Sequence, residues 1–183
     1  MKWTGTPAWR DFCPHHRLSH LPLERQATIK ISCVIGPLSI FLQNRQRAIP
    51  LDLAWLRRFA PLALEKCRGH SDDGKFALRR LDEISVAIVS DRTIARLHVE
   101  FMGIPGATDV ITFEHGEIVM SAQTAAVYAA EHGHRVEEEL ALYTVHGLLH
   151  LNGFEDANSR AAARMQRVQT RVWKQCLAQT PAL

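Results

Sequence analysis

From residue 39 onward, short apolar runs alternate with longer segments of helical periodicity, which indicates a domain containing both strands and helices. The short runs are rich in β-branched and apolar residues and predict strands at 39–43, 83–90, 108–113 and 116–121. The last two are close enough to form a hairpin around 114–116. The longer segments predict helices at 51–67, 91–102, 121–133, 158–176 and over the stretch from 137 that carries His146 and His150. One compact domain therefore accounts for residues 39–183.

Several of these helices have recognisable starting signals. Asp52 and Ser121 are suited to be N-caps, because their side-chain oxygens can accept hydrogen bonds from free main-chain N–H groups. Three glutamates at 137–139 favour the start of the next helix, where the helix dipole is positive. Pro61 marks a candidate kink inside the first helix, and a polar loop is expected around 69–75.

The composition is that of an ordinary globular domain, with 183 residues of which 46% are hydrophobic. The longest apolar runs end well before the ~20 residues that a membrane helix needs, and the N-terminus lacks the apolar centre of a signal peptide. We therefore expect a cytoplasmic location and no membrane partner. The four cysteines are scattered without a CxxC pair, which favours buried small hydrophobic side chains over disulfides or a thiolate zinc site.

Residues 1–38 are interpreted as an N-terminal extension that is either poorly ordered or translated from a start upstream of the native one. They show no sustained periodicity, apart from a candidate strand at 29–35. Residues 1–36 hold five basic and two acidic residues, which accounts for the whole net charge of +3. Because residues 37–183 are balanced at 17 basic and 17 acidic residues, the global charge does not indicate a nucleic-acid partner.

Residues 146–156, which read HGLLHLNGFED, have the spacing of a metal site. His146 and His150 are four apart, so a helix projects both imidazoles from one face. Gly153 can adopt the left-handed conformation that ends a helix, and the reversal would swing Asp156 back as a third ligand. Glu155 is a competing third ligand, although Asp156 fits the spacing better. Three protein ligands leave a fourth position for water, which is the arrangement of a catalytic zinc site.

Gly147 argues against one large class of zinc enzymes. Zinc peptidases read HExxH, with the glutamate as general base, and a glycine cannot accept a proton. Metal-assisted hydrolysis of another electrophile remains, and a phosphodiester suits both the metal and a basic stripe at helical spacing: Arg160, Arg164, Arg167, Arg171 and Lys174. A solvated helix face is the alternative explanation of this stripe.

Other polar residues have simpler explanations. Thr108 and Asp109 are candidate RNA contacts together with Arg160 and Arg164, but such a pair more often ends a turn and starts a strand. Four further histidines are interpreted as surface or loop residues rather than ligands: His98, His115, His132 and His134.

Several segments occur in a distinctive order within residues 40–177: LQNRQ, EISVAIVSD, TDVITF, GEIVMS, EHGHRVEEELALYTVHGLLHLNGF and a terminal helix. In this order the chain resembles the YbeY family of metal-dependent endoribonucleases, also called rRNA maturation factors. The resemblance implies an α/β (α+β) fold, in which a small mixed β-sheet is packed by helices that include a zincin-like metal helix, and one Zn²⁺ per chain. It also implies cleavage of single-stranded RNA in 16S rRNA 3′-end maturation and ribosome quality control, with the rRNA precursor and the small ribosomal subunit as partners.

Two positions depart from the pattern of that family. The family motif usually ends HGxLHLxGYDH, whereas this chain has Asp156 in place of the last histidine. A carboxylate also ligates zinc, so we expect metal binding to survive with a broader choice of metal. The family typically carries an arginine in an NxxYR pattern, and it is thought to contribute to activity; the residue here is Met102, which cannot contact phosphate.

These observations support two hypotheses of different classes. In the first, the chain is a zinc-dependent endoribonuclease in which His146, His150 and Asp156 hold the metal and a metal-bound water assists cleavage, with no general base assigned. In the second, motivated by Met102, it is a non-catalytic or weakly catalytic ribosome-assembly or RNA-binding factor with a structural zinc. A zinc hydrolase acting on a small molecule is a third hypothesis, but nothing in the sequence specifies a pocket for such a substrate.

Overall fold

The computed structural model describes residues 38–70, 78 and 80–181, and each strand and helix predicted between 39 and 179 is present there. In chain order the elements are β1 Ser39–Asn44, α1 Leu53–Arg68, β2 Glu83–Val89, α2 Asp91–Met102, β3 Val110–Phe113, β4 Glu117–Ser121, α3 Ala122–His132, α4 Val136–Leu151 and α5 Ser159–Gln179. The expected N-terminal extension, except for its last residue, and the candidate strand at 29–35 lie outside the described residues.

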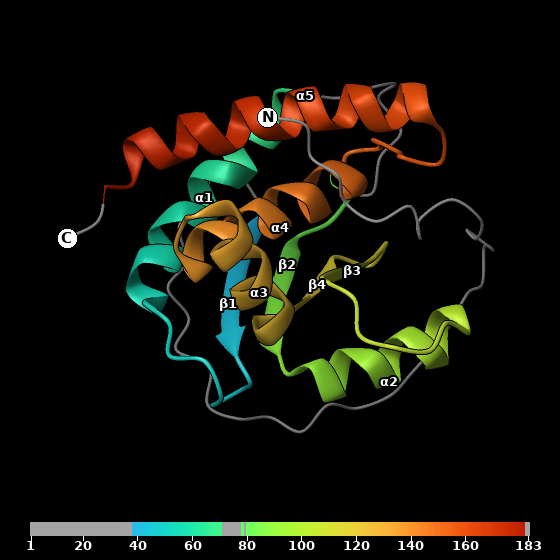
Figure 1. Ribbon diagram of the computed structural model, residues 1–183. Coiled ribbons are helices and arrows are strands. Elements are labelled where there is room, and N and C mark those ends of the chain that lie inside the picture. Colours follow the sequence, from blue (N-terminus) through green and yellow to red (C-terminus); the bar gives the residue numbers. More distant parts are fainter. Residues whose placement is uncertain (1–37, 71–77, 79, 182–183) are drawn as a thin grey trace.

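The four strands form one mixed sheet in the order β1-β2-β4-β3 (Figure 1). β1 pairs with β2 and β2 with β4 in parallel, while β3 runs antiparallel to β4 at the edge. Each parallel pair is connected through a helix, and the antiparallel pair through a tight hairpin, as the geometry of such connections requires. The expected small mixed sheet packed by helices is therefore confirmed.

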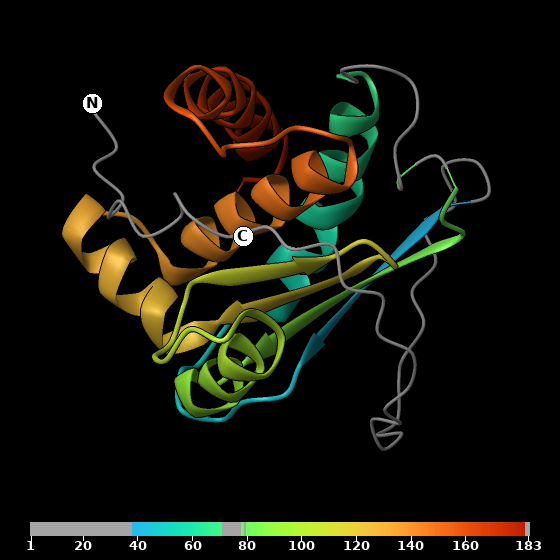
Figure 2. The same ribbon diagram turned by 90° about the vertical axis from the view of Figure 1, so that its right-hand side faces the viewer.

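Helices cover the two faces of the sheet unequally (Figure 2). α2 lies on one face, over an apolar cluster of Ala87, Val89, Ile94, Ile111 and Val119. The larger core lies on the other face, where α4 packs centrally against α1, α3, α5 and the strands β3 and β4. α5 forms an outer layer on α1 and α4. Within the part of the chain that the structure describes, no helix has both the length and the apolarity to cross a membrane.

The predicted helix starts are confirmed at both positions. The Asp52 carboxylate accepts a hydrogen bond from the N–H of Trp55, and the Ser121 hydroxyl accepts one from the N–H of Thr124. The first helix continues across Pro61, which lies inside α1. The last helix extends to Gln179, three residues beyond its predicted end.

The β3–β4 hairpin differs from its prediction by one or two residues at each strand. β3 begins at Val110 rather than at Thr108, because the Asp109 carboxylate accepts the Val110 N–H and so closes a local turn. β4 begins at Glu117, after Gly116 with a φ of 98°. A Cβ at Gly116 would lie 2.8 Å from the carbonyl oxygen of Glu83, so this turn needs glycine for space as well as conformation.

Two of the four cysteines fall within the described residues, and both have the expected role. Cys67 of α1 and Cys176 of α5 are unpaired and fully buried in the larger core. Burial raises the pKa of the Cys176 thiol to about 11, so this side chain behaves as a small neutral hydrophobic group at physiological pH.

Candidate metal centre

The structure brings together the three ligands predicted from the HGLLHLNGFED segment. His146 and His150 lie on the last two turns of α4, and Asp156 lies in the loop that follows. Their donor atoms all lie within 4.8 Å of one another, so the group could hold a metal ion. Glu155, the competing candidate, has an exposed side chain and is not part of this group.

A Schellman motif at the end of α4 positions the third ligand. The N–H of Gly153 bonds the carbonyl of His150, and the N–H of Phe154 bonds the carbonyl of Leu149. Gly153 has a φ of 85°, which confirms the left-handed turn predicted for it. The chain thereby reverses direction, and an Asp156 carboxylate oxygen comes to 4.0 Å from the Nε2 of His150.

The hydrogen bonds of the two imidazoles leave their Nε2 atoms as the metal-facing donors. The Nδ1 of His150 lies 2.9 Å from the carbonyl oxygen of Phe154, which can only accept, so Nδ1 carries the proton and Nε2 the lone pair. The Nδ1 of His146 lies 2.9 Å from the Oε1 of Gln169. With Nδ1 donating to this oxygen, the Nε2 of His146 also presents a lone pair.

The chemistry and spacing of these donors fit a zinc-class cation. The Nε2 atoms of His146 and His150 lie 3.0 Å apart, and their rings meet edge to face. Two ligands of a tetrahedral zinc at its usual bond lengths are about 3.3 Å apart. Two lone pairs that face each other repel, and a cation between them would convert this repulsion into two bonds. Burial, followed by the neighbouring His146, lowers the pKa of His150 to about 3, which keeps the imidazole neutral and able to bind metal at physiological pH.

Gly147 has a packing role that explains why no side chain follows the first histidine. A Cβ at this position would lie 2.9 Å from two carbon atoms of Ile118 and from the hydroxyl oxygen of Thr112. α4 therefore lies directly on β3 and β4 at this point, and the glutamate of a zinc peptidase has no room. Four apolar neighbours of the ligands on this helix are buried: Val145, Leu148, Leu149 and Leu151.

Helix α5 supplies a ligand-supporting residue that sequence reasoning missed. Gln169 is 9% exposed and lies on the buried face of α5 with Met165, Val172 and Cys176. A single polar residue within such an apolar stripe was the available signal, since buried polar groups are normally hydrogen-bonded. Its partner on α4 could not be identified without the packing of the two helices.

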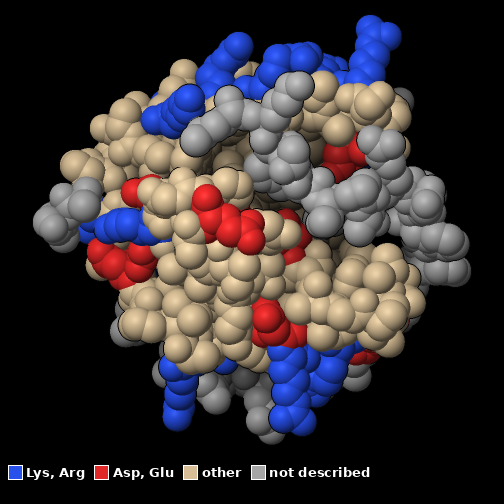
Figure 3. Space-filling view, viewed as in Figure 1, with Lys and Arg blue, Asp and Glu red and all other residues tan. Residues whose placement is uncertain are grey.

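The basic stripe on α5 is exposed, as both of its interpretations require. Its five residues, Arg160, Arg164, Arg167, Arg171 and Lys174, are all exposed, and Lys and Arg side chains gather over α5 in Figure 3. Arg164 of this stripe contacts the loop of the site: its guanidinium lies over the Phe154 ring, 5.4 Å from the ring centre. This contact places a cationic residue beside the turn whose carbonyl orients His150.

Thr108, Asp109 and Met102 have structural roles in the fold. The Thr108 hydroxyl donates to the Asp109 carboxylate, which itself caps the start of β3. Met102 is the last residue of α2 and packs against the apolar cluster beneath that helix, beside Leu97 and Phe113. Contact of Thr108 or Asp109 with RNA therefore stays a prediction.

Comparison with known proteins assigns the chain to a family. The family model described as Endoribonuclease YbeY matches residues 42–177, which is most of the chain. The chain belongs to the YbeY endoribonuclease family. Among its relatives, a protein from Thermobifida fusca named Endoribonuclease YbeY is 30% identical over 160 residues, covering 76% of this chain and 97% of its own length. The protein of the same name from Clavibacter sepedonicus is 32% identical over 131 residues, covering 62% of this chain and 80% of its own.

A solved structure is also similar to this YbeY family member. The solution structure of a Thermotoga maritima protein matches with a TM-score of 0.48 and 24% sequence identity, covering 75% of this chain and 90% of that one. The residues matched by the YbeY family model include His146, His150 and Asp156. They also include Gln169 and Arg164.

Proposed function

We propose that the chain is a zinc-dependent endoribonuclease that cleaves single-stranded RNA in the cytoplasm, with His146, His150 and Asp156 as the metal ligands. The observation that carries this proposal is the pair of Nε2 lone pairs held 3.0 Å apart beside a carboxylate, in a chain of an endoribonuclease family. The biological substrate we propose is the 16S rRNA precursor on the small ribosomal subunit, in 3′-end maturation and ribosome quality control.

The residues around the site have distinct tasks in this mechanism. The chemistry supplied by bound zinc is a lowered pKa for a coordinated water and polarisation of a phosphodiester. Gln169 and the Phe154 carbonyl hold the protons of the two imidazoles on Nδ1, so both Nε2 atoms stay available as ligands. Arg164, and Arg160 one turn before it on α5, are proposed to attract the phosphate chain toward the site.

The test uses labelled single-stranded RNA with the zinc-loaded full chain, an Asp156→Ala variant and a chelated sample. We expect cleavage by the loaded protein, a loss in the other two samples, and recovery when zinc is returned to the chelated one. A duplex of the same sequence serves as the substrate control and should resist cleavage. Cleavage that continues unchanged in both the variant and the chelated sample would exclude the metal-centred mechanism.

The packing of Met102 favours a second candidate, a ribosome-assembly or RNA-binding factor with little turnover. At the position where the resemblance led us to expect an arginine, a thioether packs on an apolar cluster and offers phosphate no charge. Binding of small ribosomal subunits without RNA cleavage would favour this candidate. A Met102→Arg variant that gains cleavage would then identify the missing arginine as the cause.

A further inference from the structure

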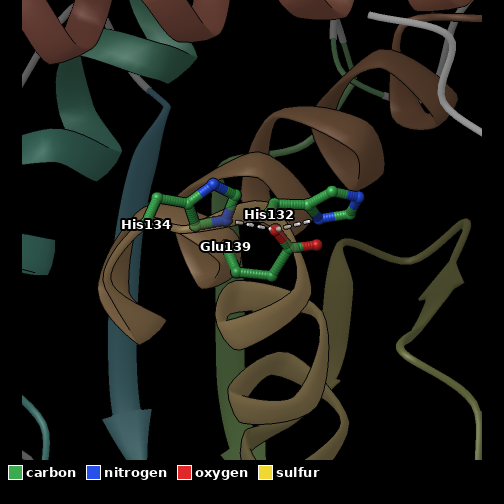
Figure 4. A group of neighbouring side chains, drawn as sticks. All are labelled: His132, His134 and Glu139. Carbon is green, nitrogen blue, oxygen red and sulfur yellow. Dashed lines mark hydrogen bonds and ion pairs between the residues drawn. The ribbon is translucent and has the colours of Figure 1, made fainter.

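A second group of metal-ligating side chains lies at the turn between α3 and α4, outside the site described above. It consists of His132, the last residue of α3, His134 in the turn, and Glu139 in α4. The donor atoms of these three residues all lie within 4.8 Å of one another. Figure 4 shows both imidazoles directed at the same carboxyl group.

We propose that His132, His134 and Glu139 form a second metal site, which takes a zinc-class divalent cation. Two imidazole nitrogens and one carboxylate oxygen are a donor set that suits zinc and similar metals. The side chains differ in exposure in a way that suits such a site: Glu139 is 2% exposed, His134 16% and His132 39%. Hence the carboxyl group forms the buried base of the site, and His132 leaves a path from solvent.

A hydrogen bond alone explains only part of this arrangement. The Nε2 of His134 lies 2.6 Å from the Oε2 of Glu139, a pairing that would by itself satisfy both groups. It leaves unexplained why the Nδ1 of His132 faces the same oxygen at 3.9 Å. A cation bound among the three atoms would replace the proton shared by His134 and Glu139 and also engage His132.

The backbone around the turn is built to bring the two histidines together. Gly133 ends α3 with a φ of 70°, so the chain reverses between His132 and His134 and their rings stack 5.7 Å apart. The His134 ring also packs against the indole ring of Trp173. The Trp173 indole N–H in turn donates to the main-chain oxygen of Glu138, which ties α5 to this end of α4.

The surroundings of Glu139 also favour a bound cation. Three acidic residues, Glu137, Glu138 and Glu139, share the first turn of α4. Among the described residues, Arg135 forms ion pairs with Glu137 and Glu138 but not with Glu139. The Tyr143 hydroxyl, one turn further along α4, is buried close to the Glu139 carboxyl. Burial and then the Glu139 carboxyl raise the pKa of Tyr143, so its hydroxyl stays protonated beside that carboxyl and can support it as a ligand.

The position of this site determines what it can do. Glu139 and His146 are seven residues apart on α4, which places them on one face of the helix and about 10 Å apart along its axis. Paired metals that act on one phosphate are about 3.5–4 Å apart, so the second ion is not a partner in the chemistry at His146. Its effect is to join α3 to α4 and stabilise the turn between them.

The experiment measures Zn²⁺ bound per chain after equilibrium dialysis of the full protein. A His146→Ala/His150→Ala background removes the first site and should retain about one equivalent of Zn²⁺ per chain. Adding His132→Ala should release this Zn²⁺, and Zn²⁺ should then no longer raise the thermal transition. His115→Ala in the same background is the control, because His115 is 68% exposed and belongs to neither group.

Glu139→Gln tests whether the carboxylate of Glu139 is a ligand. If this substitution at a buried position prevents folding, His132→Ala at an exposed position remains the decisive variant. Zinc retained equally with and without His132→Ala would overturn the proposal, as would the absence of retained zinc in the double-alanine background. Loss on His132→Ala but not on His115→Ala would support it.

Discussion

Gln169 should control the affinity of the proposed nuclease site without touching the metal. Its Oε1 accepts the Nδ1 proton of His146 at 2.9 Å from a position that is 9% exposed. Substitution Gln169→Leu keeps the approximate volume but removes this acceptor. His146 can then carry its proton on Nε2, and its ring is less constrained. Metal binding must move the proton back to Nδ1 and fix the ring again, which weakens the affinity.

The expected magnitude follows from the size of this interaction. Loss of the hydrogen-bond partner of a metal-bound histidine typically weakens metal affinity about 10–100-fold. That range corresponds to about 1.4–2.7 kcal/mol, which is similar to the ~1–3 kcal/mol cost of leaving a buried polar group unpaired. Because the other histidine, His150, is oriented by a main-chain carbonyl, no side-chain substitution removes its hydrogen bond directly.

The assay is competition for zinc between the protein and a chelator of known affinity. To isolate the nuclease site from the α3–α4 turn, each variant is made in a His132→Ala background. Gln169→Glu retains an acceptor oxygen and should bind zinc at least as tightly as the parent, whereas Gln175→Leu makes the leucine substitution at an exposed position of the same helix and should change nothing. Equal zinc affinity of Gln169→Leu and the parent would refute the role assigned to Gln169.

Three further substitutions test how the fold shapes the site. Gly153→Ala forces alanine into a φ of 85° and should lower the free energy of unfolding by about 1 kcal/mol in urea titrations. Gly153→Asn should show a smaller loss, because asparagine tolerates the left-handed conformation better; an equal loss for both variants would argue against left-handed strain. In Gly147→Ala, the clash with Ile118 should lower the free energy of unfolding by about 1–3 kcal/mol, and the better helix propensity of alanine should restore about 1 kcal/mol of it. A clearly stabilised variant would contradict the close packing. Asn152→Ala removes the 2.8 Å donor to the carbonyl of Cys67, which keeps its bond from the N–H of His70, and should lower the free energy of unfolding by about 0.5–1.5 kcal/mol; an unchanged urea midpoint would show that this buried bond contributes nothing.

Features set by neighbouring residues could be predicted well from the sequence. Helix and strand positions follow from local periodicity, and the caps at Asp52 and Ser121 depend on atoms only three residues away. The turn at Gly153 is equally local, because only the residue's own φ decides it. The spacing of His146 and His150 on one helix then fixes their proximity.

Features that depend on packing between distant segments could not be obtained in this way. Gln169 meets His146 only because α5 packs on α4, and 23 residues separate them. The reason for Gly147 lies in its contact with β3 and β4, which no pattern along α4 records. His134 was expected to be a surface or loop residue, yet its hydrogen bond to the buried Glu139 becomes visible only when the α3–α4 turn is built.

The environment of Met102 makes the proposed gain-of-function test interpretable. The side chain is half-buried at the end of α2, where it covers the apolar cluster beside Leu97 and Phe113. An arginine has an aliphatic stem of similar length, which can cover the same surface while the guanidinium extends into water. Met102→Arg should therefore fold with nearly unchanged stability, so a change in RNA cleavage would report the added charge. If cleavage stayed absent in a folded, zinc-loaded Met102→Arg protein, the missing arginine would not be what limits activity.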